Sequence, residues 1–197
     1  MSRTIDDHLK QINPTGIDWI ELTEKQQLKV REEWDAVVSD PGNLSCACPN
    51  TSCANNRKCK KCIALHRYYD GVPECLRPLV DKVQASVPQE KKYNVHYKIQ
   101  ADGALYGIVD PTDPDGSRER LMKANTPEKM KKVVEKWAAI IADPENTKCD
   151  CPNVDCKYHG NCVKCVALHR YYGGFPHCVR YIIDEIDAIV ETHGQAE

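Results

Sequence analysis

The sequence predicts a mainly α-helical fold with little β structure, arranged as two tandem helix–loop–helix repeats with a β-hairpin between them. Segments 23–87 and 126–190 align without a gap and are identical at 30 of 65 positions. In each segment, apolar residues at helical spacing flank a cysteine-rich string. Between the segments, residues 93–99 alternate apolar and polar side chains with the period of a β-strand.

Composition limits the classes of protein to consider. The chain has 197 residues, of which 41% are hydrophobic and 28% charged, as in ordinary soluble domains. The formal net charge of −2 favours neither nucleic acid nor a membrane surface as partner. The N-terminus lacks the apolar stretch of a secretory signal, and no apolar run is long enough to span a membrane. We therefore expect a cytoplasmic protein without membrane contact.

The duplication divides the chain into five parts. They are an N-terminal lead-in (1–22), a first cysteine-rich repeat (23–87), a linker with the β-hairpin (88–125), a second cysteine-rich repeat (126–190) and a tail (191–197). Within the lead-in, Ile17–Leu22 suggests a short strand.

The first helix of each repeat has clear start and stop signals. Thr23 followed by Gln26 forms a capping box, and the helix should run to Ser39, because Asp40-Pro41 disfavours its continuation. The second repeat has equivalent signals at Thr126, Pro127 and Asp143-Pro144. The apolar stripes of these helices are Leu28, Val30, Trp34, Val37 and Val38, and Val133, Val134, Trp137, Ile140 and Ile141.

The rest of each repeat should be a loop and two further helices. Residues 46–62 have little apolar content and predict a loop, and a short helix should begin at Cys62 and end at Gly71. Pro73 opens the final helix, which Pro78 should delay or kink. In the second repeat, Gly173-Gly174 and Pro176 take the corresponding positions.

The linker predicts a hairpin followed by a loop. Asp102-Gly103 is a hairpin turn signal, and Ala104–Val109 should be the returning strand. Residues 110–116 contain two prolines among aspartates and predict a loop.

All twelve cysteines lie in the two strings, and each cysteine of the first string recurs 103 residues later in the second string. In a reducing cytosol, clustered cysteines indicate metal binding more often than disulfides. The C-x-C and C-x-x-C spacings are awkward for local disulfides and suit a shared ion. The candidate ligands are Cys46, Cys48, Cys53, Cys59, Cys62, His66 and Cys75 in the first repeat, and Cys149, Cys151, Cys156, Cys162, Cys165, His169 and Cys178 in the second.

The ligand count favours zinc, with two ions per repeat. Two tetrahedral ions need eight ligand positions, which seven ligands supply if one thiolate bridges the two ions. Three alternatives remain open. One closed zinc site per repeat would leave some thiolates partly free, an iron–sulfur cluster would use the same thiolates, and copper(I) also prefers such soft ligands.

Other polar residues near the strings have simpler interpretations. We expect His159, His177 and the isolated His8, His96 and His193 to be solvated. In the two His-Arg-Tyr-Tyr blocks, we expect Arg67 and Arg170 to offset thiolate charge and the tyrosines to pack over the metal site.

At this motif the chain resembles a group of small, functionally uncharacterised bacterial cysteine-rich proteins. Their pattern is C-x-C-P, a Cys, H-G-x-C-x-x-C, then H-R and P-x-C. The second copy follows it most closely, at Cys151-Pro152, His159-Gly160-Asn161-Cys162 and His169-Arg170. The first copy has Asn56-Arg57 where the pattern has His-Gly, which argues against His159 as an essential ligand. The resemblance covers about 30 residues of each copy and implies cytosolic metal binding.

Three functions fit these observations. The first is a zinc-stabilised structural or regulatory module that binds a protein partner, since no catalytic or nucleotide-binding motif and no catalytic residue is evident. The second is a nucleic-acid-binding zinc module, because Arg57, Lys58, Lys60, Lys61 and Arg67 make the first copy basic. The third is a redox or metal-handling protein that uses exposed thiolates.

Overall fold

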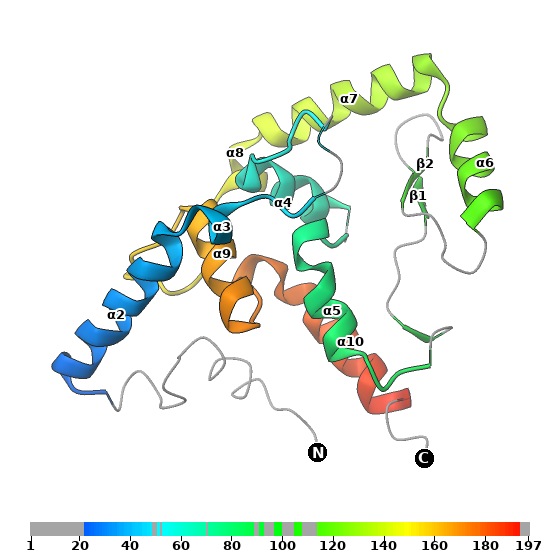
Figure 1. Ribbon diagram of the computed structural model, residues 1–197. Helices are drawn as coiled ribbons and strands as arrows, with labels where there is room; N and C mark the ends of the chain where they lie inside the picture. The colour runs from blue at the N-terminus through cyan, green and yellow to red at the C-terminus, as the bar shows by residue number, and fades with distance from the viewer. Residues whose placement is uncertain are drawn as a thin grey trace.

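The computed structural model describes residues 22–48, 51, 53–69, 71–88, 91–92, 97–99, 105–107 and 114–193. The protein is mainly helical, as predicted (Figure 1). The strand expected at Ile17–Leu22 lies outside these residues except for Leu22, and so do the hairpin turn and residues 194–197. In the described part of the chain, no helix combines the length and apolar character needed to cross a membrane.

The two long helices begin and end where their capping residues predict. Helix α2 (Glu24–Ser39) is capped by Thr23, whose hydroxyl accepts from the Gln26 N–H while the Gln26 side chain accepts from the Thr23 N–H at 2.9 Å. Helix α7 (Pro127–Ala142) is capped by Thr126. These contacts satisfy backbone N–H groups that a helix start leaves without an intrahelical partner.

A short helix follows each long one, and neither was predicted. Helices α3 (Pro41–Leu44) and α8 (Pro144–Thr147) start at the prolines that stop α2 and α7. Asp40 and Asp143 cap them, accepting from backbone N–H groups at 2.8 and 2.9 Å. The Asp-Pro pair therefore turns the chain and restarts it as a helix, because proline suits the first helical turn.

The central helices begin earlier than predicted. Helices α4 (Cys59–Tyr68) and α9 (Cys162–Tyr172) include the cysteines that we expected in a loop. The expectation that residues 46–62 form one loop is therefore wrong from Cys59 onward. Cys59 and Cys62 occupy one helix face, since residues three apart are neighbours on a helix. Gly173 ends α9 in the left-handed conformation at φ 72°, as predicted.

The final helices each start with one 3₁₀ turn. Turn η2 (Glu74–Leu76) leads into α5 (Arg77–Val83), and η5 (His177–Val179) leads into the longer α10 (Arg180–His193). Pro78 lies in the first turn of α5, so the helix starts late, as its sequence predicts.

The described part of the linker forms two short strands and a helix. Strands β1 (Tyr97–Ile99) and β2 (Leu105–Gly107) pair antiparallel, with Tyr97 opposite Gly107. Helix α6 (Pro114–Ala124) contacts β2. The loop predicted for 110–116 is wrong from Pro114 onward, because this proline occupies the first turn of a helix whose later residues, from Arg118 to Ala124, are good helix formers.

The helices pack across the two sequence copies. Helix α2 and α3 of the first copy contact α9 of the second, whereas α7 and α8 of the second contact α4 of the first. Figure 1 shows α4 and α9 at the centre, with α2 and α7 extending outward and α5 beside α10. Each copy therefore covers the central helix of the other copy with its own first helix.

Both apolar clusters combine the two copies. The larger cluster packs α4 and α5 against α9, η5 and α10, through Ile63, Val72, Leu76, Val80, Val166, Val179, Ile182 and Ile186. The smaller cluster packs Val37 and Val38 of α2 against Tyr158 and Leu168. Leu28 and Val134 were expected on buried faces but are 58% and 52% exposed. The larger cluster places the two cysteine strings next to one another.

Candidate metal centres

The second cysteine string surrounds one cavity. This cavity has a volume of about 320 Å³, and all seven predicted ligands of the second copy line it: Cys149, Cys151, Cys156, Cys162, Cys165, His169 and Cys178. Trp34 of α2 and Ile63 of α4 line it from the first copy. The structure therefore brings together the complete set predicted for this copy.

The cysteines of the first string also lie close to one another. Burial, together with smaller effects of Cys75, Cys59, Cys53 and Cys48, raises the pKa of the Cys62 thiol to about 12. Charges act this strongly only over short distances inside a protein.

Cys75 completes the first group. Burial raises its pKa to about 11, with Cys59 and Cys46 acting in the same direction. Each of the six cysteines of the first string thus interacts electrostatically with at least one other member of the string. Cys162 adds to the raised pKa of Cys59, so the two groups adjoin.

All twelve cysteines are free thiols of intermediate exposure. Within the described ranges, no three His, Cys, Asp or Glu side chains are grouped closely enough to hold a metal ion as they stand. The donors are gathered around a common space but do not converge on one point. Side-chain rotation toward that space is therefore required for coordination.

A second observation, besides its place in the cavity lining, supports His169 as a candidate metal ligand. Its Nδ1 atom is buried and has no hydrogen-bond partner among the described residues. Burial lowers the pKa of the imidazole to about 4, so the ring is neutral and has a lone pair available near pH 7. An unpartnered buried nitrogen is costly in a folded protein, and a cation in the adjoining cavity would satisfy it.

His66 occupies the equivalent place in the first copy. The Gly71 N–H donates to the His66 carbonyl at 2.7 Å, and the Gly174 N–H donates to the His169 carbonyl at 2.8 Å. A Cβ on Gly71 would lie 3.3 Å from His66 Nδ1, so the backbone packs closely against this ring. The same local turn therefore holds both histidines.

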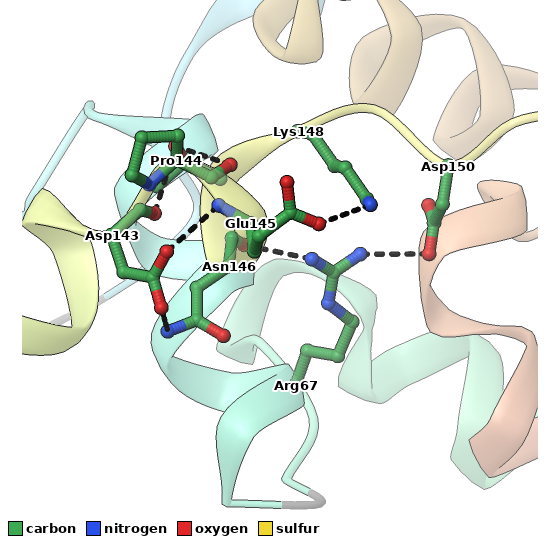
Figure 2. A network of polar contacts seen from close by, with 8 residues as sticks. Arg67, Asp143, Pro144, Glu145, Asn146, Lys148 and Asp150 are labelled. Carbon is green, nitrogen blue, oxygen red and sulfur yellow. Dashed lines mark hydrogen bonds and ion pairs between the residues drawn. The ribbon is translucent and has the colours of Figure 1, made fainter.

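The two arginines of the His-Arg-Tyr-Tyr blocks reach across to the opposite string. Arg67 donates to Asp150 at 2.8 Å and to the carbonyl of Asn146 at 2.7 Å (Figure 2). Arg170 donates to the carbonyl of Ser45 at 3.1 Å. Each arginine thus holds the segment that leads into the other copy's first cysteine.

These arginines also act on the thiols. Arg67 lowers the pKa of Cys162 and of Cys178, opposing the larger effect of burial. Arg170 lowers the pKa of Cys59 and of Cys75 in the same way. The arginines therefore offset thiolate charge, but on these four thiols each arginine acts on the opposite copy, which the sequence did not indicate.

The tyrosines of the two blocks differ in exposure. In each pair the rings meet edge to face with centroids 5.0 Å apart. Tyr68 and Tyr171 are 48% and 58% exposed. Tyr172 packs against the smaller cluster, as Cys156 and Cys165 do, so this tyrosine lies against the same cluster as two of the thiols.

Two histidines that we expected to be solvated line the cavity of the second copy. His159 is partly buried, and its Nδ1 lies 3.9 Å from Cys149 Sγ and 3.2 Å from the Asn153 carbonyl oxygen. His177 lines the same cavity and is also partly buried. Both side chains are therefore partly buried rather than fully solvated. Comparison of the two copies did not identify these histidines, because Asn56 and Glu74 occupy the equivalent positions in the first copy.

Comparison with known proteins gives no family assignment: no family model matches the chain, and no curated protein and no solved structure is significantly similar to it.

Proposed function

We propose that the protein is a zinc-binding scaffold with two duplicated Cys₆His modules, each holding two zinc ions, that presents surfaces to a protein partner. The observation that carries this proposal is the cavity of the second copy, which is lined by six free thiols and one unpartnered imidazole. Sulfur and imidazole nitrogen are the ligands that structural zinc prefers.

Zinc would supply stability rather than a reactive group in this proposal. The thiols lie between helices that come from both copies, so ions held there would join segments distant in the sequence. Structural zinc sites contribute directly to folding free energy.

The partner surface is supported by the exposed tyrosines. Tyr68 and Tyr171 hold equivalent positions in the two copies, and tyrosine is enriched among the residues that dominate protein interfaces. Among the basic residues that suggest nucleic acid, Arg67 is engaged by Asp150 within the chain. This contact makes the nucleic-acid alternative the weaker one.

Metal analysis of the purified protein tests the proposal. We expect four colourless zinc ions per chain. Two ions per chain would replace the two-ion modules by one closed site per copy, and visible thiolate–iron absorption would contradict the zinc assignment.

A single substitution tests the ligand set. Cys165→Ser should fold and lose at least one zinc ion per chain, because serine is a poor ligand for this ion. Val163→Ser is the matched control on the same helix, since Val163 is 37% exposed and should keep all its metal. Full zinc content in Cys165→Ser would refute the site.

A further inference from the structure

We infer that His159 is an eighth metal ligand in the second copy, so that the two modules bind their ions differently. This inference rests on the proposed two-ion modules and goes beyond them. The first copy has Asn56 at this position. It therefore has seven protein ligands and must share one thiolate between its two ions, whereas the second copy has eight ligands and needs no shared sulfur.

The position of the His159 ring carries the inference. Its Nδ1 lies 3.9 Å from Cys149 Sγ. Two ligands of one tetrahedral zinc ion, at ~2.3 Å for sulfur and ~2.0 Å for nitrogen, stand roughly 3.6 Å apart. The two atoms are thus already separated by almost the distance that a shared ion requires.

Metal binding through Nδ1 would replace the remaining polar contact of the ring. The Asn153 carbonyl oxygen lies 3.2 Å from the same Nδ1, so in the metal-free chain an Nδ1–H donates to it. When an ion binds to Cys149, the proton resides on Nε2 and the Nδ1 lone pair faces the ion. This is a change of tautomer in a neutral ring and needs no other reactant.

The backbone places residue 56 and residue 159 equivalently. The Asn56 N–H donates to the Cys53 carbonyl at 2.9 Å, and the His159 N–H donates to the Cys156 carbonyl at 2.8 Å. The next residue has positive φ in both copies, 62° at Arg57 and 75° at Gly160. A histidine introduced at position 56 would therefore start from the backbone geometry that His159 has.

Cadmium-113 substitution tests the inference in the full chain. A bridging thiolate transmits scalar coupling between two ¹¹³Cd nuclei, whereas two ions without a common ligand show none. We expect four ¹¹³Cd resonances, with one coupled pair from the first copy and two uncoupled signals from the second. Proton–cadmium correlation should detect three histidine rings, those of His66, His169 and His159.

Exchange of one residue between the copies makes the test reciprocal. In His159→Asn, both pairs should be coupled and the third histidine correlation should disappear. In Asn56→His, all coupling should disappear and a fourth histidine correlation should appear. His177→Gln is the matched control, because His177 lines the same cavity, and it should leave the wild-type pattern unchanged.

The outcomes separate this inference from the proposed function. Fewer than four bound ions per chain would contradict the two-ion modules themselves. Four ions with two coupled pairs in the wild type, or with no correlation to His159, would keep the modules and overturn the eighth ligand. A control that changes the pattern as His159→Asn does would also overturn the assignment.

Discussion

At the scale of single residues, the unpartnered Nδ1 of His169 carries a cost in stability that a bound ion would remove. This Nδ1 is buried and has no hydrogen-bond partner within the described part of the chain. Burial of a polar atom without a partner costs roughly 1–3 kcal/mol. A ligand that removes this cost therefore stabilises the fold beyond its own bonds.

Substitution of His169 by leucine should have opposite effects with and without metal. In chelated protein, His169→Leu should raise the free energy of unfolding by about 1 kcal/mol, because an apolar side chain replaces an unsatisfied one. In zinc-loaded protein, it should lower this free energy and remove at least one ion per chain. Chemical denaturation with metal analysis checks both. A change of the same sign in both states would mean that His169 has only a structural role.

Backbone conformation predicts a second asymmetry between the copies. Arg57 adopts φ 62°, whereas the equivalent residue of the second copy is Gly160 at φ 75°. Left-handed conformations are costly for residues with a Cβ and free of that cost for glycine. Arg57→Gly should therefore raise the unfolding free energy by about 1 kcal/mol. Arg57→Ala, which also removes the charge but keeps the Cβ, should give no such increase.

At the scale of elements, one polar contact anchors α2 to the second string. Asp35 accepts from the Tyr158 hydroxyl at 2.5 Å and pairs with Lys157. These contacts lower the pKa of Asp35, with the Lys157 hydrogen bond as the largest cause. The opposite interface lacks this anchor, because Ala138 of α7 and Asn55 take the places of Asp35 and Tyr158.

Removal of this anchor should weaken the attachment of α2. Asp35→Asn should lower the unfolding free energy by about 1 kcal/mol, a figure reduced because the site is partly exposed. The pKa of Asp35 is depressed from 3.8, so its contribution is complete above that pH and is lost as pH falls through the lower folded value. The difference from wild type should thus be equal at pH 7 and pH 5. A difference that shrinks between these two values would contradict this assignment.

Local signals predicted many helix boundaries but not the packing of the helices. Thr23, Thr126 and the Asp-Pro pairs marked the ends of α2 and α7 because capping depends only on neighbouring residues. Helix α6 was missed because its aspartates and prolines suggested a loop. The residues that line the cavity of the second copy could be predicted from the duplication, whereas the place of His159 beside them could not, because it lacks a counterpart in the first copy.

The sequence could not show which of the two central helices α2 packs against. Both copies present the same kind of apolar stripe and the same kind of central helix. Either stripe could therefore cover either string, and only the three-dimensional structure shows that Val37 and Val38 pack on Leu168 of the other copy.

At the scale of the whole molecule, the two copies are interlocked rather than linked in series. Helix α2 covers α9, α7 covers α4, and Arg67 and Arg170 each hold the other copy's cysteine string. Separation of the copies would expose both apolar clusters and both sets of thiols.

Cleavage of the linker should therefore leave the molecule intact. A protease site inserted between β2 and α6 should, after cutting, give two fragments that stay together in gel filtration and keep all their zinc. We expect the fragments to stay together because the larger apolar cluster contains eight buried residues that come from both fragments. The same fragments should separate in denaturant. Two folded monomeric fragments in native buffer would show that the copies are independent.

The exchange of α2 and α7 between the copies also bears on the origin of the chain. Apart from the linker, the first helix of each copy packs against the central helix of the other copy. This reciprocity is the arrangement of a twofold homodimer with exchanged helices. A one-copy ancestor with this cysteine string would have had to dimerise to cover it, and fusion of two such genes would have made that pairing permanent. Once the halves shared a single gene, the positions of His159 and Asn56 were free to diverge.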